Sequence, residues 1–355
     1  MMHRAQKTKE DSPASSGARE ILRQYLAGSA GHVSMLLVLM TVTLLAAGIF
    51  WNERQEYARL NFEREADELI SKLVERLRNY EDGLWAGVSL IESRNNQIGL
   101  DEWTKFATVL DLQKKYPGIN GMGVIFNVRK REIEKFIAAQ RVFRPEFGIH
   151  PEHENNVYLP ITYVVPVMGN EKAVGLDVAF EAHRLEAAIL ARDTGLAQVT
   201  APIALVQDKG KTPGFLYYAP YYDADTADQK VWTNEDRQAH FIGMTYMPIV
   251  MNKFVEGFRG SKKTPRISFK VSDGKDLLFD EQNVNEFNFD SSPLFTKKVD
   301  IKVTGRTWSF DLQSNKLFRA EYHSLAPIFI LIFGLGATGA IGFILQRNKK
   351  GSRSR

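Results

Sequence analysis

The chain has 355 residues, of which 44% are hydrophobic, so it can form two or three domains with buried cores. Because it contains no cysteine, a disulfide framework and a cysteine nucleophile are excluded. The net charge of +4 comes from the basic terminal segments, and it gives no reason to expect a nucleic-acid partner.

Two segments are predicted to span a membrane. Residues 32–51 and 324–345 are almost free of ionisable side chains, and each is long enough to cross ~30 Å of hydrocarbon. A cleaved signal peptide is the alternative for the first segment, but signal peptides have a shorter leader and a shorter apolar core. We therefore expect a two-pass protein of the inner (plasma) membrane.

Basic residues set the expected orientation. Lysines and arginines gather in the tails at residues 1–31 and 346–355, and basic segments beside a span stay in the cytoplasm. Both termini are therefore expected to be cytoplasmic, with residues 52–323 outside. The lack of cysteine in this exported region favours a bacterial periplasm over a eukaryotic cell surface.

Residues 52–98 are predicted to form a long stalk helix. They contain no proline, and apolar residues three or four positions apart give one narrow seam: Ala66, Ile70, Leu73, Leu77, Tyr80, Leu84 and Ile91. Two interpretations are open. The seam either packs against its own domain or pairs with the same helix of a second copy, and its narrowness favours a homodimer.

After the stalk, the pattern predicts two small α+β modules, at residues 99–240 and 241–323. In the first, a helix around Leu185–Arg192, ended by Gly195, is expected to cover one face of a sheet and to enclose a pocket. The expected strands of this module are Gly121–Val128, Val164–Val167, Gln198–Gln207 and Phe215–Tyr221, with further helices at Asp101–Lys114 and Arg129–Gln140. The second module is expected to contain a helix at Val250–Phe258 and strands at Phe241–Met247, Arg266–Val271, Leu277–Phe279, Phe295–Val303 and Thr307–Leu312.

Few motifs indicate catalysis. The cluster from His150 to Glu154 has metal-ligand residue types, but Pro151 prevents the helix that would place both histidines on one face, so a solvated loop is favoured. Gly334–Gly339 matches a dinucleotide-binding pattern, yet it lies inside a predicted span with no strand before it. Its small residues could instead pack against a partner helix. We therefore expect no enzymatic activity, no metal and no cofactor.

Asp177 is the residue that stands out in the first module. It interrupts an apolar segment, where an ionised carboxylate must be hydrogen-bonded or paired to remain charged. As a structural group it could cap the helix that starts near Glu181, or pair with Arg184 or Arg192. As a ligand group it could accept N–H donors from a small polar molecule. Both interpretations are open on spacing alone.

Several short motifs together resemble the CHASE family of extracellular sensor domains, which are found in histidine kinases and nucleotide cyclases and include the plant cytokinin receptors. The resemblance covers about residues 100–250, and its motifs are Tyr116-Pro117-Gly118-Ile119, Tyr158-Leu-Pro160 with Tyr163 and Pro166, Gly175-Leu-Asp177, Ala191-Arg-Asp-Thr-Gly195, Thr200-Ala-Pro202, and Gly214-Phe215 to Pro220.

The resemblance implies a long N-terminal helix followed by two PAS-like modules, of which the membrane-distal one binds ligand. Asp177 matches an aspartate that holds the ligand ring in adenine-recognising relatives, Val199 matches a backbone contact, and Thr194 matches a threonine beneath the pocket. Tyr163, Thr200 and Gln207 lie in or beside the same elements and complete the expected ligand contacts.

The function expected from these observations is a membrane-anchored sensor that binds a small molecule and signals across the membrane. CHASE domains normally precede a cytoplasmic output module, whereas here residues 346–355 follow the second span, so we expect a separate kinase, cyclase or phosphodiesterase to read the signal. The alternative is an envelope scaffold that uses a CHASE-like domain for protein contacts.

Overall fold

The computed structural model describes residues 14–205, 212–223, 232–259, 265–284, 286–322 and 324–351. The chain divides into two compact units. One comprises Met1–Asn61 and Ala320–Arg355, and the other comprises Phe62–Arg319.

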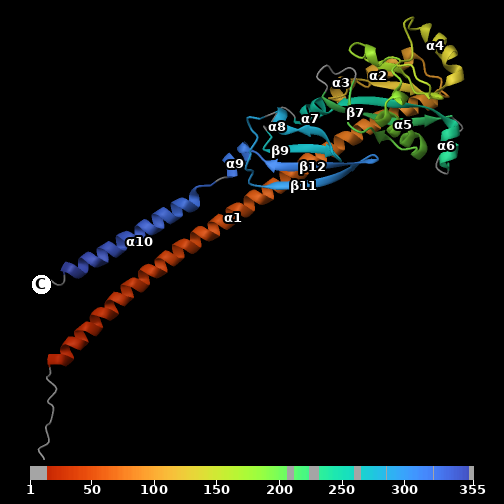
Figure 1. Cartoon of the computed structure of the whole chain (residues 1–355). Helices are drawn as coiled ribbons and strands as arrows, with labels where there is room; N and C mark the ends of the chain where they lie inside the picture. The colour runs from red at the N-terminus through yellow and green to blue at the C-terminus, as the bar shows by residue number, and fades with distance from the viewer. Residues whose placement is uncertain are drawn as a thin grey trace, which may run out of the picture. The chain divides into compact units, whose positions relative to one another are not determined.

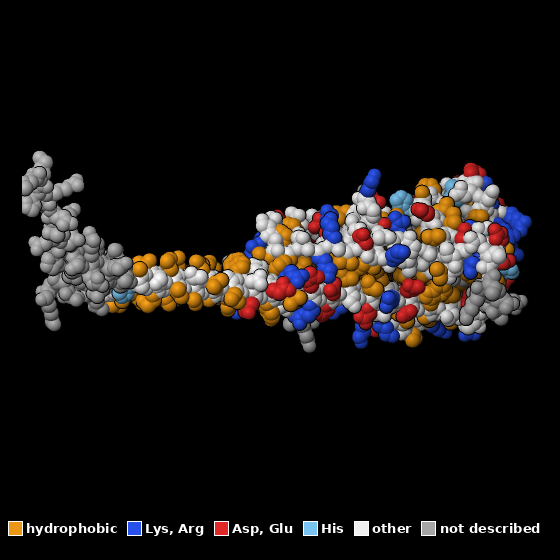
Figure 2. Space-filling model, turned by 90° about the horizontal axis from the view of Figure 1, so that it is seen from below, with side chains coloured by type: hydrophobic (Ala, Val, Ile, Leu, Met, Phe, Trp, Pro, Cys, Tyr) orange, Lys and Arg blue, Asp and Glu red, His pale blue; other side chains and the backbone are white. Residues whose placement is uncertain are grey.

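The first unit is formed by two apolar helical segments, from α1 (Ala14–Ser93) and α10 (Ala326–Gly351). The large hydrophobic side chains of both segments are mostly exposed. Figure 2 shows hydrophobic side chains along the surface of the apolar part of α1. Gly334 of α10 lies so close to α1 that a Cβ atom there would be 2.2 Å from Cγ2 of Thr43. Gly334 and Gly342 thus lie against the first apolar segment within one chain, whereas Gly336 and Gly339 have no atom within 4 Å of an added Cβ. Both helices are long and apolar enough to cross a membrane.

The second unit contains two antiparallel sheets, and the larger one has the strand order β4-β1-β8-β7-β5, with β6 added to β7 (Figure 1). Its strands are β1 (Met122–Phe126), β4 (Ile161–Val165), β5 (Gln198–Val199), β6 (Ile203–Ala204), β7 (Pro213–Tyr222) and β8 (Phe241–Val250). A two-stranded ribbon pairs β2 (Val128–Arg129) with β3 (Val157–Tyr158). The surrounding helices are α2 (Leu100–Val109), α3 (Leu112–Lys115), α4 (Ile133–Arg141), α5 (Ala182–Thr194), α6 (Asn234–His240) and α7 (Met251–Arg259).

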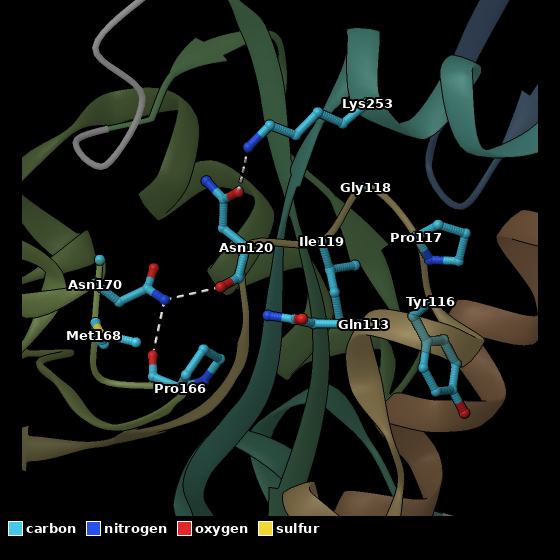
Figure 3. Close-up of a pocket in the computed structure, with 11 residues that line it drawn as sticks. Gln113, Tyr116, Pro117, Gly118, Ile119, Asn120, Pro166, Met168, Asn170 and Lys253 are labelled. Carbon is cyan, nitrogen blue, oxygen red and sulfur yellow. Dashed lines mark hydrogen bonds between the residues drawn. The ribbon is translucent and has the colours of Figure 1, made fainter.

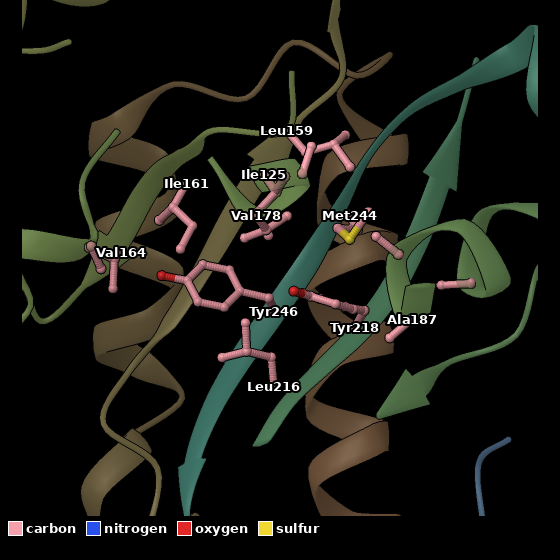
Figure 4. Packing of buried hydrophobic residues seen from close by; sticks show 14 of the residues in the cluster. Ile125, Leu159, Ile161, Val164, Val178, Ala187, Leu216, Tyr218, Met244 and Tyr246 are labelled. Carbon is pink, nitrogen blue, oxygen red and sulfur yellow. The ribbon is translucent and has the colours of Figure 1, made fainter. Parts of the chain in front are cut away.

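Side chains of the central strands β7 and β8 alternate between two buried faces. On one face, the Tyr217 hydroxyl donates to Glu81 of α1 at 2.7 Å, and Thr245 donates to a backbone carbonyl of the same helix at 3.1 Å. On the other face, Tyr218 and Tyr246 belong to the core cluster beneath α5 (Figure 4). Because helices cover both faces, these strands are apolar along almost their whole length.

The apolar seam of α1 is buried inside its own domain. Ala66, Leu73, Leu84 and Ile91 are all fully covered, and Ile70 is half-buried. The interpretation that this seam pairs with a second copy is therefore wrong, because the seam residues are already covered by the sheets. A narrow row of apolar residues on a helix is compatible with packing on a sheet as well as with packing on another helix, so its width could not decide between the two interpretations.

The smaller sheet has the order β10-β9-β12-β11 and lies along the same helix. Its strands are β9 (Ile267–Asp273), β10 (Asp276–Asp280), β11 (Thr296–Val303) and β12 (Arg306–Ser314), with the short helices α8 (Glu281–Val284) and α9 (Lys316–Tyr322) beside it. The α+β class and the long N-terminal helix are as expected. The PAS-like character of the two modules stays a prediction.

Three expected elements differ from the structure. The expected boundary between the modules at residues 240–241 is wrong, because β8 lies between β1 and β7 in the larger sheet. The pattern located this strand correctly, but its partner β1 is over 100 residues away in the chain. The expected strand Gln198–Gln207 is interrupted within its described part, where β5 and β6 flank Pro202, which has no N–H for the ladder. The expected helix Asp101–Lys114 breaks at Asp111, whose φ of 54° is left-handed.

Candidate functional site

A cavity of about 460 Å³ lies along α5, between that helix, the β2–β3 ribbon and the start of β8. Its apolar lining is Val157, Leu159, Ala179, Leu185, Ala188, Ile189, Ala239 and Phe241. Its polar lining is Asn127, Arg129, Asn155, Asn156, Arg192 and Gln238, so these described residues include two arginines and four amides but no carboxylate. An apolar floor with a few polar groups is the usual composition of a small-molecule site.

Local capping interactions hold α5 in place as one wall of this cavity. Glu181 precedes the helix and accepts the backbone N–H groups of His183 and Arg184, both at 3.1 Å. Gly195 ends the helix in the left-handed conformation, with φ of 70°, as a glycine C-cap does. The expected helix and its expected cap are both present, and Leu185 on this helix lines the cavity.

Asp177 holds two other parts of the wall. Its side chain is fully buried, and its Oδ1 accepts the backbone N–H of Leu159 and that of Ala179, both at 2.8 Å. Its Oδ2 lies 2.7 Å from Nε2 of His153. Asp177 therefore caps the short 3-10 helix Val178–Phe180, and the expected pairing with Arg184 or Arg192 is replaced by pairing with a histidine.

His153 extends this network to a third lining residue. Its ring stacks on Tyr158 at a centroid distance of 4.2 Å, and its Nδ1 accepts the backbone N–H of Asn155 at 3.2 Å. Because Nδ1 accepts a hydrogen bond, Nε2 carries the proton and donates it to Asp177. The His153–Asp177 pair thus fixes the backbone at Leu159, Ala179 and Asn155, all of which line the cavity.

Sequence reasoning missed His153 as a partner of Asp177. It assigned the segment from His150 to Glu154 to a solvated loop, with metal binding as the alternative. In the structure, His150 and His153 contact different groups, since Nε2 of His150 lies 3.1 Å from the carbonyl oxygen of Val174. The only available signal was the presence of an uncompensated aspartate and an unassigned histidine in one module.

The other expected ligand contacts lie elsewhere. The Thr194 hydroxyl donates to the Leu190 carbonyl at 2.6 Å, and Val199 is buried in β5. Thr200 continues the pairing with β7, because its Oγ1 accepts the Leu216 N–H at 3.0 Å. Tyr163 donates to the Ile98 carbonyl at 3.4 Å, in the segment after α1. None of these residues lines the cavity, and Gln207 lies outside the described residues.

A second cavity, of about 430 Å³, lies where β1 begins and α7 starts (Figure 3). Lys253 donates to the side-chain oxygen of Asn120 at 3.4 Å, and Asn170 donates to the carbonyls of Asn120 and Pro166, both at 2.8 Å. These amides therefore tie two loops together at the wall of this cavity.

The smaller sheet contacts the end of α5. The turn between β11 and β12 brings Gly305 so close that a Cβ there would lie 2.1 Å from Oε1 of Gln198 and 3.1 Å from Cδ2 of Leu190. Beside this contact, the rings of Phe215 in β7 and Trp308 in β12 pack edge to face, with centroids 5.1 Å apart. The helix that walls the cavity is thus in direct contact with the second sheet.

A model of the CHASE domain family matches residues 96–282, more than half of the chain. The chain belongs to the CHASE domain family. The match includes the cavity along α5 and the whole larger sheet, and it extends through β9 and β10 of the smaller one. Membership assigns this region to the extracellular sensor domains.

Comparison with solved structures finds more distant similarity. An extracellular ligand binding receptor from Desulfohalobium retbaense shares 9% identity at a TM-score of 0.44, and the alignment covers 72% of this chain and 40% of that one. The periplasmic sensory domain of a Campylobacter jejuni chemoreceptor shares 11% identity at a TM-score of 0.41, covering 76% and 97%. A methyl-accepting chemotaxis protein shares 12% identity at a TM-score of 0.39, covering 74% and 100%. No curated protein matches the sequence significantly.

Proposed function

We propose that this CHASE domain protein is a sensor that binds a small molecule in the cavity along α5 and carries the signal through a membrane to an output protein. The observation that carries this proposal is the construction of the cavity wall. One buried carboxylate, Asp177, together with His153, holds the backbone of three lining residues. Such fixed walls reduce the entropy lost when a ligand is bound.

Asp177 acts in this proposal as a positioning residue. Its side chain is 0% exposed, and its oxygens are occupied by two backbone N–H groups and one imidazole. A ligand therefore contacts the groups that Asp177 holds, which differs from the direct contact that the resemblance implies. The protein is proposed to bind and signal rather than to catalyse a reaction.

The route of the signal runs along α5. This helix lines the cavity with Leu185, Ile189 and Arg192, and its Leu190 contacts the turn at Gly305 of the smaller sheet. A ligand shifts this arrangement only if it binds two arrangements with different affinities, and a tenfold difference corresponds to about 1.4 kcal/mol. The apolar segments of α1 and α10 are proposed as membrane spans, with residues 52–323 in the periplasm or outside the cell.

The test uses the full-length chain in lipid nanodiscs and a thermal-shift panel of nucleobases, amino acids and organic acids. A true ligand raises the melting temperature by mass action. Ala239 lines the cavity and is exposed on α6, so the larger side chain of Ala239→Trp should fill the cavity without entering the core. We expect it to weaken binding at least tenfold, about 1.4 kcal/mol.

The matched control is Ala139→Trp, on an exposed face of α4 away from the cavity, which should leave the affinity unchanged. Equal losses in both variants would contradict the assignment of the site. If no compound in the panel raised the melting temperature, the alternative of an envelope scaffold with an empty cavity would be favoured.

A further inference from the structure

Three buried polar side chains in the core beneath α5 have donor atoms without a partner among the described residues. They are Nε of Arg184 and the hydroxyls of Tyr218 and Tyr246. Arg184 is 7% exposed and both tyrosines are 0% exposed. Folding normally pairs such groups, because a buried donor without an acceptor loses its hydrogen bond to water and gains none in return.

The three side chains come from three elements, the strands β7 and β8 and the helix α5 that packs on them. Tyr218 of β7 pairs directly with Tyr246 of β8, and Figure 4 shows their rings in one layer with the hydroxyls pointing in the same direction. Arg184 descends from the first turn of α5. Arg184 is buried on the same face of α5 as Ala187, Ala188 and Ala191, and these alanines belong to the cluster that contains both tyrosines. Burial raises the pKa of both tyrosines, so their hydroxyls keep their protons and remain donors.

The existing contacts of Arg184 leave its guanidinium incompletely used. Its terminal nitrogen donates to the Ala204 carbonyl at a long 3.4 Å, and its Nε lies 3.7 Å from Oε2 of Glu181, beyond hydrogen-bond distance. Glu181 is itself engaged with two backbone N–H groups at the start of α5. Arg184 therefore has an ion-pair partner in Glu181 but no carboxylate within hydrogen-bond distance of its Nε.

The chemistry of these groups selects their missing partner. A guanidinium can only donate, and its planar fork matches the two oxygens of a carboxylate. Each tyrosine hydroxyl can add one further donor to the same acceptor. A carboxylate is a common anion with two acceptor oxygens in one plane, so it complements this set of three donors.

The cluster adjoins the cavity along α5. Leu159, Ala179, Ala188 and Phe241 belong both to the lining of the cavity and to the core cluster that contains the two tyrosines. The α5 residues that belong to this cluster are Ala187, Ala188 and Ala191, whose side chains are short, and the partly buried Leu185 packs against it. A molecule in the cavity therefore borders the same layer of side chains as the three unpartnered donors.

We propose that Arg184, Tyr218 and Tyr246 form the anchoring subsite for the carboxylate of a small organic acid that enters through the cavity along α5. This inference rests on the proposed function and specifies its ligand class. The apolar part of the acid lies against the cavity floor, and the carboxylate satisfies the buried donors.

The test measures binding to the full-length chain in nanodiscs with matched probes. Benzoate and hexanoate are compared with benzamide and hexanamide, which keep the shape but lack the charge, by calorimetry and thermal shift at millimolar concentrations. We expect the carboxylates to bind and the amides to bind at least tenfold more weakly. Tyr218→Phe removes one unpartnered hydroxyl, so it should weaken benzoate binding about tenfold while leaving the melting temperature of the free protein unchanged or higher.

The matched control is Tyr221→Phe. Tyr221 is also fully buried with an unpartnered hydroxyl, but it lies outside the cluster, so its removal should not change benzoate binding. Arg184→Met should abolish the preference for carboxylate over amide, and it retains volume at a buried position. A merely structural role for these groups would change the melting temperature without changing this preference.

Two results would overturn the inference. One is the absence of stabilisation by either carboxylate, and the other is equal binding of acid and amide in the wild type. If other compounds of the earlier panel still bound, and Ala239→Trp still weakened them, the proposed function would stand and only the carboxylate assignment would fall. If neither class bound and Ala239→Trp had no effect, both would fall.

Discussion

The two sheets of the second unit use their charged side chains differently. In the smaller sheet Arg306 pairs with Asp273, and beside the sheet Arg319 of α9 donates to Asp290 at 2.8 Å. Lys297 of β11 joins that sheet to α1, with 2.6 Å to Asp67. Arg184, on the helix α5 that packs on the larger sheet, pairs with Glu181 at a longer 3.7 Å. The difference is that arginines of the smaller sheet and its flanking helix pair closely with acids, whereas Arg184 of α5 pairs only loosely with one.

The largest expected loss of stability comes from removing Asp177, which holds the wall of the cavity along α5. Asp177→Ala leaves two backbone N–H groups and His153 without their acceptor, and it should reduce the free energy of unfolding by about 3 kcal/mol. Urea unfolding of the full-length chain measures this loss. Asp177→Asn keeps an acceptor for the N–H groups, so it should fold but bind ligand more weakly.

Glu154 supplies the control for that variant. It is an acid in the neighbouring segment whose side chain is 96% exposed in its pair with Lys130. Glu154→Ala should leave the free energy of unfolding essentially unchanged, because an exposed ion pair contributes little. A similar loss in Glu154→Ala and Asp177→Ala would show that the segment, rather than the buried carboxylate, determines the effect.

A second variant tests the contact between the sheets. Gly305 has a φ of 83°, and a Cβ there would meet Gln198 at 2.1 Å, so Gly305→Ala should cost about 1–3 kcal/mol and weaken the ligand response. Gly274 is the matched control, since it has a φ of 59° in another turn but no atom within 4 Å of an added Cβ. Gly274→Ala should show only the backbone strain. Equal behaviour of the two variants would contradict a role for the contact.

The smallest expected effect on stability comes from the ion pair between Arg319 and Asp290, beside the smaller sheet. The hydrogen bond from Arg319 lowers the pKa of Asp290 below its ordinary value of 3.8. Folded Asp290 thus binds protons less readily than unfolded Asp290, so the pair contributes its full stability above that value and loses it as the pH falls toward the lowered pKa. Asp290→Asn should lower stability by about 1 kcal/mol at neutral pH and flatten the acid limb of a pH–melting curve.

The control for that experiment is Asp311→Asn. Asp311 also pairs with a cation, Lys298, at 3.0 Å, but the two side chains are 46% and 85% exposed. We expect the melting temperature at neutral pH to change far less than in Asp290→Asn, because an exposed ion pair contributes little. A flattened acid limb in this variant too would assign the pH dependence to net charge instead of to the buried pair.

Local signals in the sequence located most elements of the fold. The α5 helix and its Gly195 cap follow from spacing and glycine chemistry within one segment, and the strands of the smaller sheet follow from alternation around turns. Partners over long distances did not follow. The place of β8 between β1 and β7, and the packing of the α1 seam on its own sheets, depend on tertiary contacts that no local pattern encodes.

The candidate site divides in the same way. The sequence singled out Asp177 because a lone carboxylate in an apolar segment needs a partner, and the structure shows that it has one. Its identity as His153, 24 residues away, could not be read from spacing. Neither could the donors beneath α5, since Tyr218 and Tyr246 follow the same pattern as tyrosines on the opposite face. Only the three-dimensional arrangement distinguishes an aromatic that fills a core from one that lacks an acceptor.

The part of α1 from Phe62 to Ser93 contacts both sheets. Its Glu81 accepts a hydrogen bond from Tyr217 of the larger sheet, and its Asp67 pairs with Lys297 of the smaller sheet. One consequence is genetic. If a substitution in one sheet impairs signalling by displacing this helix, a second substitution in the other sheet, far away in sequence, can restore the helix position and the signal. Selection for restored signalling from a Tyr217→Phe strain would then yield suppressors that cluster around β11 as well as around β7.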